Sequence, residues 1–151
     1  MTQTQTQTQT MAPRDPDFAD RIAASFVRQA AMRTLGIELR SVAPGLVVLA
    51  FDAAAGLGQQ HGFVHGGVLA TALDSACGYA ALSLSDAGAE VLTVEFKVNF
   101  LAPAAASRFV CEGRVLKSGR TLTVCEGQAR DSADVLVATM NATMILRHPN
   151  G

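Results

Sequence analysis

The chain has 151 residues, and its 12 lysines and arginines against 13 aspartates and glutamates leave a formal net charge of −1. This length suits one domain, which can bury roughly two-thirds of the surface that its unfolded chain exposes. The near-neutral charge excludes the strongly basic proteins that gather nucleic acid or an anionic membrane surface through their own field.

Residues 1–10 alternate threonine and glutamine after the first methionine. Such a segment cannot bury enough apolar surface to offset the entropy lost on ordering, so we expect disorder there and a linker up to residue 16. The residues that follow, 17–148, are predicted to form a single domain.

From Phe18 onward, apolar residues recur every three to four positions, which predicts one amphipathic helix that ends near Gly36. Residues 36–42 and 46–51 lie on either side of an Ala-Pro-Gly turn and predict a β-hairpin. A loop over residues 52–58 then leads to the central part of the chain.

The stretch Val68–Ser85 is long enough for a helix and apolar on nearly every side, with Asp74 as its one charge. A helix of this kind belongs inside a protein. Gly78 and several serines interrupt the stretch and no basic clusters flank it, which disfavours a membrane span. Because an unpaired buried carboxylate costs several kcal/mol, Asp74 requires a physical reason.

Four strand segments follow this helix. In the first, apolar residues from Leu92 to Phe100 alternate with polar ones, which predicts one buried and one polar face, and Pro103 ends it. Residues 108–116 and 122–130 predict a second hairpin, and residues 135–146 predict the last strand. The element order predicts an α+β domain: a six-stranded antiparallel sheet wrapped around a long central helix, with an N-terminal helix.

The three cysteines are odd in number and widely spaced. We expect them to be reduced core residues of a cytoplasmic protein, and they form no recognisable zinc pattern with the histidines. They are Cys77, Cys111 and Cys125.

Gly66 and Gly67 lead into the central helix, where unobstructed N–H groups carry the positive end of the helix dipole and can hold an oxyanion. A tight turn is the simpler interpretation of the pair. Asp74 can act as a general base on water or as a nucleophile, or serve as a structural acid. Because the helix rise puts Asp74 roughly 10 Å or more from the glycines, we expect a two-fold dimer that brings one subunit's glycines to the other's Asp74.

Three motifs occur in a fixed order, namely Gln59…His65-Gly66-Gly67…Asp74, then the segment 91–103, then the segment 117–121. Together they resemble hotdog-fold acyl-CoA thioesterases of the PaaI-like, phenylacetate-pathway branch, over most of the chain. The resemblance implies the hotdog fold and hydrolysis of a CoA thioester by water without metal or redox cofactor. It also implies a homodimer with composite active sites, often paired again into a homotetramer.

The resemblance assigns roles to single residues as well. Gln59 is expected to orient the water or polarise the carbonyl, with Gln60 as its competitor. His65 is expected to contact the thioester oxygen or to orient the Gly-Gly turn. Thr93 is expected to position the water, although a β-branched residue in a strand needs no function.

Two further groups of residues are expected to contact the substrate. Cys77, Gly78 and Tyr79 follow Asp74 within about a turn and are expected to line the acyl pocket. A hairpin turn is expected to lie along the pantetheine and nucleotide of coenzyme A, with a solvated basic turn as the simpler interpretation. That turn consists of Lys117, Ser118, Gly119 and Arg120.

The sequence leaves the acyl group open between a medium-chain and an aryl-acetyl group. Two other functions compete with hydrolysis: a hotdog acyl-thioester hydratase or dehydratase, and a non-catalytic acyl-CoA-binding or regulatory module. The first usually places a catalytic histidine in differently spaced motifs, and the second would keep the CoA turn and lose the acid. The presence of Asp74 favours the thioesterase.

Overall fold

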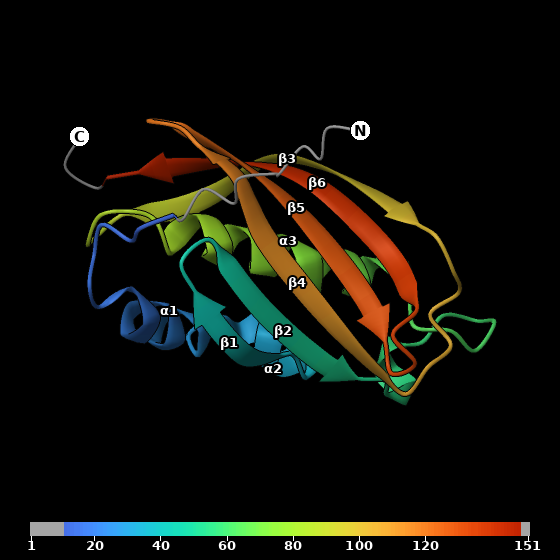
Figure 1. Cartoon of the computed structure of the whole chain (residues 1–151). Helices are drawn as coiled ribbons and strands as arrows, with labels where there is room; N and C mark the ends of the chain where they lie inside the picture. Colours follow the sequence, from blue (N-terminus) through green and yellow to red (C-terminus); the bar gives the residue numbers. More distant parts are fainter. Residues whose placement is uncertain (1–10, 149–151) are drawn as a thin grey trace, which may run out of the picture.

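The computed structural model describes residues 11–148, in which six strands curl around one long helix, α3 (Figure 1). The strands form one antiparallel sheet in the order β1-β2-β4-β5-β6-β3, so β1 and β3 are its edges. The helices are α1 (Phe18–Phe26), α2 (Ala30–Leu35) and α3 (Gly66–Leu82), with a 3-10 turn, η1, at Ala55–Leu57. The strands are β1 (Glu38–Ala43), β2 (Leu46–Asp52), β3 (Glu90–Phe100), β4 (Arg108–Ser118), β5 (Leu122–Asp131) and β6 (Leu136–Arg147).

Helix α3 packs directly on the sheet, which confirms the predicted hotdog arrangement. Two glycines in neighbouring strands allow this close approach. A Cβ atom added at Gly113 would lie within 2.5 Å of the Ala76 carbonyl oxygen, and one at Gly127 would lie 3.1 Å from a Leu73 methyl. At these two positions the sheet has no side chain that would hold the helix away.

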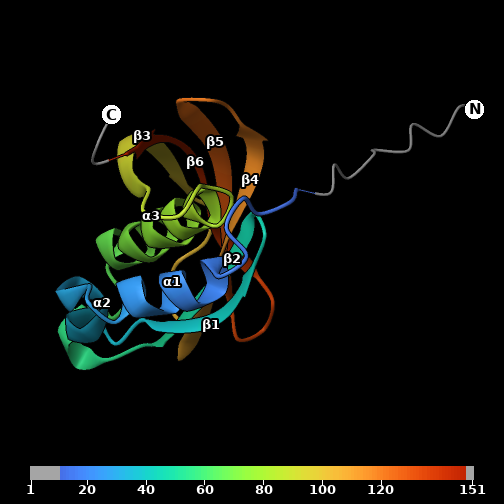
Figure 2. The ribbon, with the colours of Figure 1, turned by 90° about the vertical axis from the view of Figure 1, so that its left-hand side faces the viewer.

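The N-terminal region contains two helices where one was predicted. Helix α1 ends at Phe26, and Gln29 has an extended backbone before α2 begins. The break follows from a tertiary contact, because the Gln29 side chain bonds to Tyr79 and Ser75 of α3. The predicted end is confirmed: Gly36 takes the left-handed conformation, φ 66°, after α2. Both helices lie beside α3 (Figure 2). The predicted hairpin of β1 and β2 is also confirmed.

The segment expected to be a linker is partly packed into the fold. The Asp15 side chain is buried and forms an ion pair of 2.8 Å with Arg21. The Arg21 guanidinium also donates to the carbonyl oxygens of Leu82 and Ser85, at the C-terminal end of α3. These bonds fix α1 to α3. The disorder predicted for residues 1–10 lies outside the described residues.

Strand β3 differs from the predicted alternation because it contains a bulge. Thr93 pairs with Met144 and Glu95 pairs with Thr143, which leaves Val94 as an extra residue between them. Thr93 therefore faces α3 with buried Met144, on the opposite side of the sheet from Glu95. The predicted buried face is also wrong for the single chain, since Phe96 is 43% exposed. Leu92, Val94 and Phe100 of this edge strand are exposed as well, whereas Val91 and Val98 pack against the core.

Candidate active site

The start of α3 is capped by His65. Its Nδ1 accepts the Gly67 N–H at 2.9 Å, while its carbonyl oxygen accepts the N–H of Val68. The N–H of Gly66 has no acceptor among residues 11–148. Of the two expected oxyanion donors, only Gly66 is therefore free in the single chain; the Gly67 N–H is occupied by the cap. The side chain of His65 therefore contacts the Gly-Gly turn itself.

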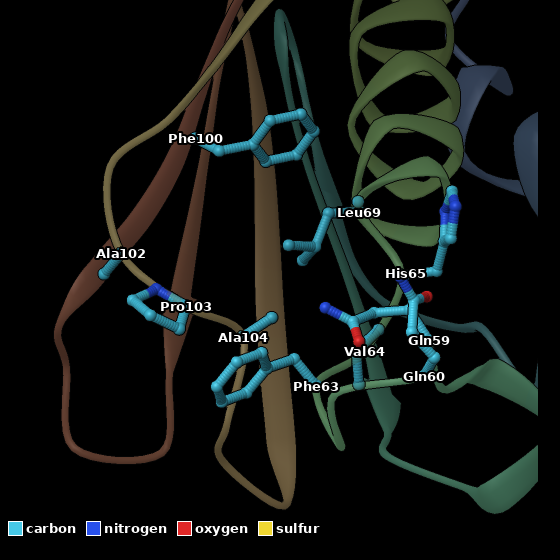
Figure 3. Close-up of a pocket in the computed structure, with 11 residues that line it drawn as sticks. Gln59, Gln60, Phe63, Val64, His65, Leu69, Phe100, Ala102, Pro103 and Ala104 are labelled. Carbon is cyan, nitrogen blue, oxygen red and sulfur yellow. The ribbon is translucent and has the colours of Figure 1, made fainter.

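An apolar cavity of about 400 Å³ opens beside Gly66. Figure 3 shows Leu69 and Phe100 next to the helix start, whereas the imidazole of His65 lies on its other side. Phe100 is in close contact with Gly66, because a Cβ atom added there would lie 2.8 Å from its ring. This cavity is called the glycine-side cavity below.

The loop before α3 brings both candidate glutamines to the glycine-side cavity. Gln59 is half-buried and its side-chain oxygen accepts the N–H of His61, while Gln60 is exposed. The backbone N–H of Gln59 donates to the Phe63 carbonyl at 2.8 Å, which closes the loop. Both side chains line the cavity.

Asp74 lines a second cavity, of about 710 Å³, with Thr93 at its side. The Thr93 hydroxyl donates to Asp74 Oδ1 at 2.7 Å, so the bulge in β3 and the middle of α3 meet at this carboxylate. Asp74 is half-buried in the single chain, not deeply buried as predicted, because the cavity leaves one side of it open. We call this space the aspartate-side cavity.

Two of the three residues expected to line an acyl pocket lie in the aspartate-side cavity. Gly78, one helical turn after Asp74, forms part of its wall, as does Tyr79. The Tyr79 hydroxyl lies 3.2 Å from the Ser25 hydroxyl and accepts a hydrogen bond of 3.1 Å from the Gln29 amide. Sequence reasoning missed the residues from α1 and its break, because no local motif marks a residue whose partner lies 50 positions away.

Cys77 was expected beside Gly78 and Tyr79 but lies elsewhere. It is fully buried on the side of α3 that faces the sheet, and a Cβ atom added at Gly127 would lie 3.3 Å from its sulfur. Burial raises the pKa of the Cys77 thiol, and it raises the pKa of Cys111 and of Cys125 to about 12. Cys77 therefore lines neither cavity and carries no reactive thiolate.

The expected CoA turn connects β4 and β5. The N–H of Gly119 donates to the Leu122 carbonyl at 2.8 Å and closes the turn, beside half-buried Ser118. Lys117 and Arg120 are exposed. None of the four turn residues lines the two cavities in the single chain.

The two halves of the predicted chemistry are therefore separate within one chain. Gly66 and Gln59 line the glycine-side cavity, whereas Asp74 and Thr93 line the other.

Between residues 11 and 148, no group of three or more histidine, cysteine, aspartate or glutamate side chains is arranged to hold a metal ion. Nor does any helix in that part of the chain have the length and apolarity needed to cross a membrane.

The family description "Thioesterase superfamily" matches residues 61–138, just over half of the chain. The chain belongs to the thioesterase superfamily. Its matched region begins in the loop before α3 and ends in β6, so it includes both Gly66 and Asp74. A solved thioesterase family protein from Silicibacter pomeroyi is 48% identical, with a TM-score of 0.83 and coverage of 85% of this chain and 97% of that chain.

Other similar proteins agree with this family. A protein of Saccharolobus solfataricus that is named as an esterase is 40% identical over 74 residues, 49% of this chain, and the chain spans about half, 52%, of that relative. A medium/long-chain acyl-CoA thioesterase from Salmonella typhimurium is 24% identical over 129 residues, 76% of this chain and 83% of the relative. The E. coli PaaI protein of the phenylacetic acid degradation operon shares the fold, with a TM-score of 0.78, 24% identity and coverage of 85% and 92%. The chain thus shares the hotdog fold of PaaI and belongs to a superfamily whose relatives are named as thioesterases and esterases.

Proposed function

We propose that this protein is an acyl-CoA thioesterase that hydrolyses a medium-chain or aryl-acetyl CoA thioester to the free acid and CoA. The observation that carries the proposal is the pairing of Asp74 with Thr93 at the wall of a cavity large enough for part of a substrate. The superfamily and the printed name of the Salmonella relative support a CoA thioester as the substrate.

In this proposal Asp74 acts as the general base. It takes a proton from water while the water oxygen attacks the thioester carbon, and Thr93 holds the carboxylate by its hydroxyl. The N–H of Gly66 stabilises the oxyanion that develops on the carbonyl oxygen. The C–S bond then breaks, and the leaving thiolate takes up the proton that Asp74 holds. Direct attack by the carboxylate, with an anhydride intermediate, is the alternative role of Asp74.

The proposed site is shared between two copies of the chain. Asp74 lies eight residues after Gly66, about 12 Å along the helix axis, which is too far for one carbonyl group to contact both. Edge strand β3 carries exposed apolar residues, among them Phe96, at 43% exposure, and Phe100, at 53%. Pairing of this edge with that of a second copy covers them, and a two-fold axis there sets Gly66 beside the other subunit's Asp74. The family resemblance described above also implies that two such dimers often pair into a tetramer.

The remaining contacts complete the proposal. Gln59, or Gln60 in its place, orients the water or the carbonyl from the glycine-side cavity, and His65 keeps the helix start in position. The cations of the β4–β5 turn, Lys117 and Arg120, meet phosphates of CoA from the surface. The three free cysteines suit a reducing, cytoplasmic location.

Hydrolysis of a panel of acyl-CoA thioesters tests this function directly. Release of free thiol is measured for aliphatic and aryl-acetyl chains, with the wild-type protein beside Asp74→Asn, which keeps the shape and removes the base. We expect hydrolysis by the wild type and a loss of about a hundredfold or more in kcat with Asp74→Asn. Full activity of Asp74→Asn contradicts the assigned chemistry, and binding of acyl-CoA without any thiol release favours the non-catalytic module.

A further inference from the structure

Three side chains form a row next to Asp74, on the face of the sheet that packs against α3. Met144 of β6 is paired with Thr93 of β3 on one side and with Thr123 of β5 on the other. Met144 and Thr123 are both fully buried. The row therefore begins at the aspartate-side cavity, where Thr93 meets Asp74, and continues into the core.

The Thr93 hydroxyl has two acceptors within reach. Its oxygen lies 2.7 Å from Asp74 Oδ1 and 3.5 Å from the sulfur of Met144. A thioether sulfur is a weak acceptor and has no hydrogen to donate. Because a hydroxyl carries one hydrogen, Thr93 can donate to only one of the two at a time. The ionised carboxylate is the stronger acceptor, so the hydrogen points to Asp74 while Asp74 is charged.

This preference changes when Asp74 takes up a proton, as the proposed function requires in each turnover. A protonated carboxyl has an O–H to donate, and its neutral oxygens accept less strongly than charged ones. With the proton on Oδ1, the bond to Thr93 reverses, so that Asp74 donates and Thr93 Oγ1 accepts. The Thr93 hydrogen must then turn away from Asp74, and it needs another acceptor. Met144 is the acceptor that the core supplies.

We propose that Met144 is a positioning residue that acts on Asp74 through Thr93. Its sulfur accepts the Thr93 hydrogen while Asp74 Oδ1 carries the proton taken from water. The hydroxyl only rotates about its C–O bond, so Thr93 keeps its hydrogen and no covalent bond of the row changes. When Asp74 passes its proton to the leaving thiolate, the hydroxyl turns back to the carboxylate. The place of this reversal in turnover rests on the proposed function, whereas the reversal itself needs only the protonation of Asp74.

Thr123 provides a contrast within the same row. Its buried hydroxyl has no hydrogen-bond partner among residues 11–148, so the sulfur of Met144 is free to accept from Thr93. Replacement of an unpaired buried hydroxyl by a methyl group is close to neutral or stabilising. Thr123→Val is therefore the matched control for Thr93→Val, on the other side of the same methionine.

Other titratable groups line the cavity of Asp74 or interact with it, and they also affect how readily it takes up a proton. They belong to α1 and the segment after it, to α3 and to β3, and they are Arg21, Arg28, Cys77, Tyr79 and Glu90. Burial above all raises the pKa of the Cys77 thiol, which therefore stays protonated. Met144→Leu leaves all of these groups in place, so a difference between it and the wild type reports the loss of the sulfur.

Titration of the Asp74 carboxyl carbon by NMR tests the reversal without any need for activity. The signal is assigned by its absence from Asp74→Asn, and its midpoint is compared between wild type and Met144→Leu, which has a similar apolar volume. Loss of the acceptor disfavours only the protonated form. The midpoint should therefore fall by about 0.5 pH unit, which is about a threefold change in the protonation equilibrium.

Met140→Leu is the matched control for Met144→Leu. Met140 lies on the same face of β6 and is 1% exposed, and its partners in the sheet, Val98 and Gly127, have no hydroxyl. This substitution makes the same chemical change in the same core. It should leave the titration midpoint of Asp74 where the wild type has it.

A double-variant cycle separates the proposed role from simple packing. In the Thr93→Val background the sulfur has no hydroxyl to accept from, so Met144→Leu should cause no further shift. In the Thr123→Val background the shift caused by Met144→Leu should remain complete. An equal shift with and without the Thr93 hydroxyl overturns the proposal, and so does the absence of any shift in the otherwise wild-type protein.

Kinetics place the reversal in the proposed reaction. With octanoyl-CoA, Met144→Leu should move the acidic limb of the kcat–pH profile down by the same amount, about 0.5 pH unit, and lower the highest kcat about threefold with little change in KM. A midpoint shift in a protein that releases no thiol from acyl-CoA removes the proposed function and leaves the reversal of the hydrogen bond. Thiol release without a midpoint shift removes the role of Met144 and leaves the thioesterase.

Discussion

The hydrogen bond between Thr93 and Asp74 offers the sharpest test of the site. It joins a hydroxyl on the edge strand to the proposed base on α3, over 2.7 Å. Thr93→Val keeps the branched shape of the side chain and removes only its ability to donate. Thr93→Ser keeps the donor and removes a methyl group, and it serves as the matched control.

The expected magnitude follows from the charge of the acceptor. A hydrogen bond to a charged group contributes about 1.5–3 kcal/mol, roughly twice a neutral one. If the bond holds the carboxylate in place during proton transfer, its loss lowers kcat by about tenfold to about 150-fold, since about 1.4 kcal/mol equals a factor of ten. Exposure of Thr93 in the single chain favours the lower end of this range, and coverage by a second copy favours the upper end.

The assay is steady-state release of free thiol from a medium-chain acyl-CoA, with kcat and KM determined separately. We expect Thr93→Val to lower kcat with little change in KM, and Thr93→Ser to keep most of the activity. A urea midpoint equal to wild type shows that the fold is intact. Wild-type kcat in Thr93→Val, with the protein folded, would refute the view that this bond prepares Asp74 for catalysis.

Three further predictions concern the fold and the assembly. Gly113→Ala forces a methyl group into the α3 backbone and should cost about 3 kcal/mol or more in urea denaturation, whereas Gly56→Ala, with open space around it, should be close to neutral. Phe96→Asp should yield inactive monomers in sedimentation, whereas Val110→Asp, on the outer face of β4, should leave the dimer intact; an active Phe96→Asp monomer contradicts the shared site. The Asp17 N–H and the Arg21 guanidinium hold the pKa of Asp15 below its ordinary value of 3.8, against the opposing effect of burial. Asp15 therefore stabilises the fold above that value and loses the effect as the pH falls through its folded pKa. Asp15→Asn should lower the urea midpoint at pH 7, and its difference from wild type should shrink as the pH falls below 3.8.

Several features of the protein were determined by its sequence alone. The apolar stretch with one charge indicated a buried helix, and the strand periods around it indicated a sheet that wraps it, because segments that avoid water must cover one another. The pair Gly66-Gly67 located the helix start, and the distance along the helix to Asp74 showed that one chain cannot bring both to one carbonyl. These are properties of short segments, so the pattern of apolar, charged and glycine residues within each segment is enough to predict them.

Only the tertiary structure decided how these segments meet. The alternating sequence of β3 predicted that Thr93 and Glu95 lie on the same face of the strand. The bulge at Val94 puts them on opposite faces of the sheet, so that Thr93 reaches Asp74. The same holds for Gln29, whose contact with α3 ends a helix that its own residues would have continued. Strand register and side-chain partners depend on contacts between residues far apart in the chain. The free energy of those contacts outweighs the conformational preference of the local sequence. A hydrophobic period of two or of 3.6 residues does not indicate which distant residues will make them.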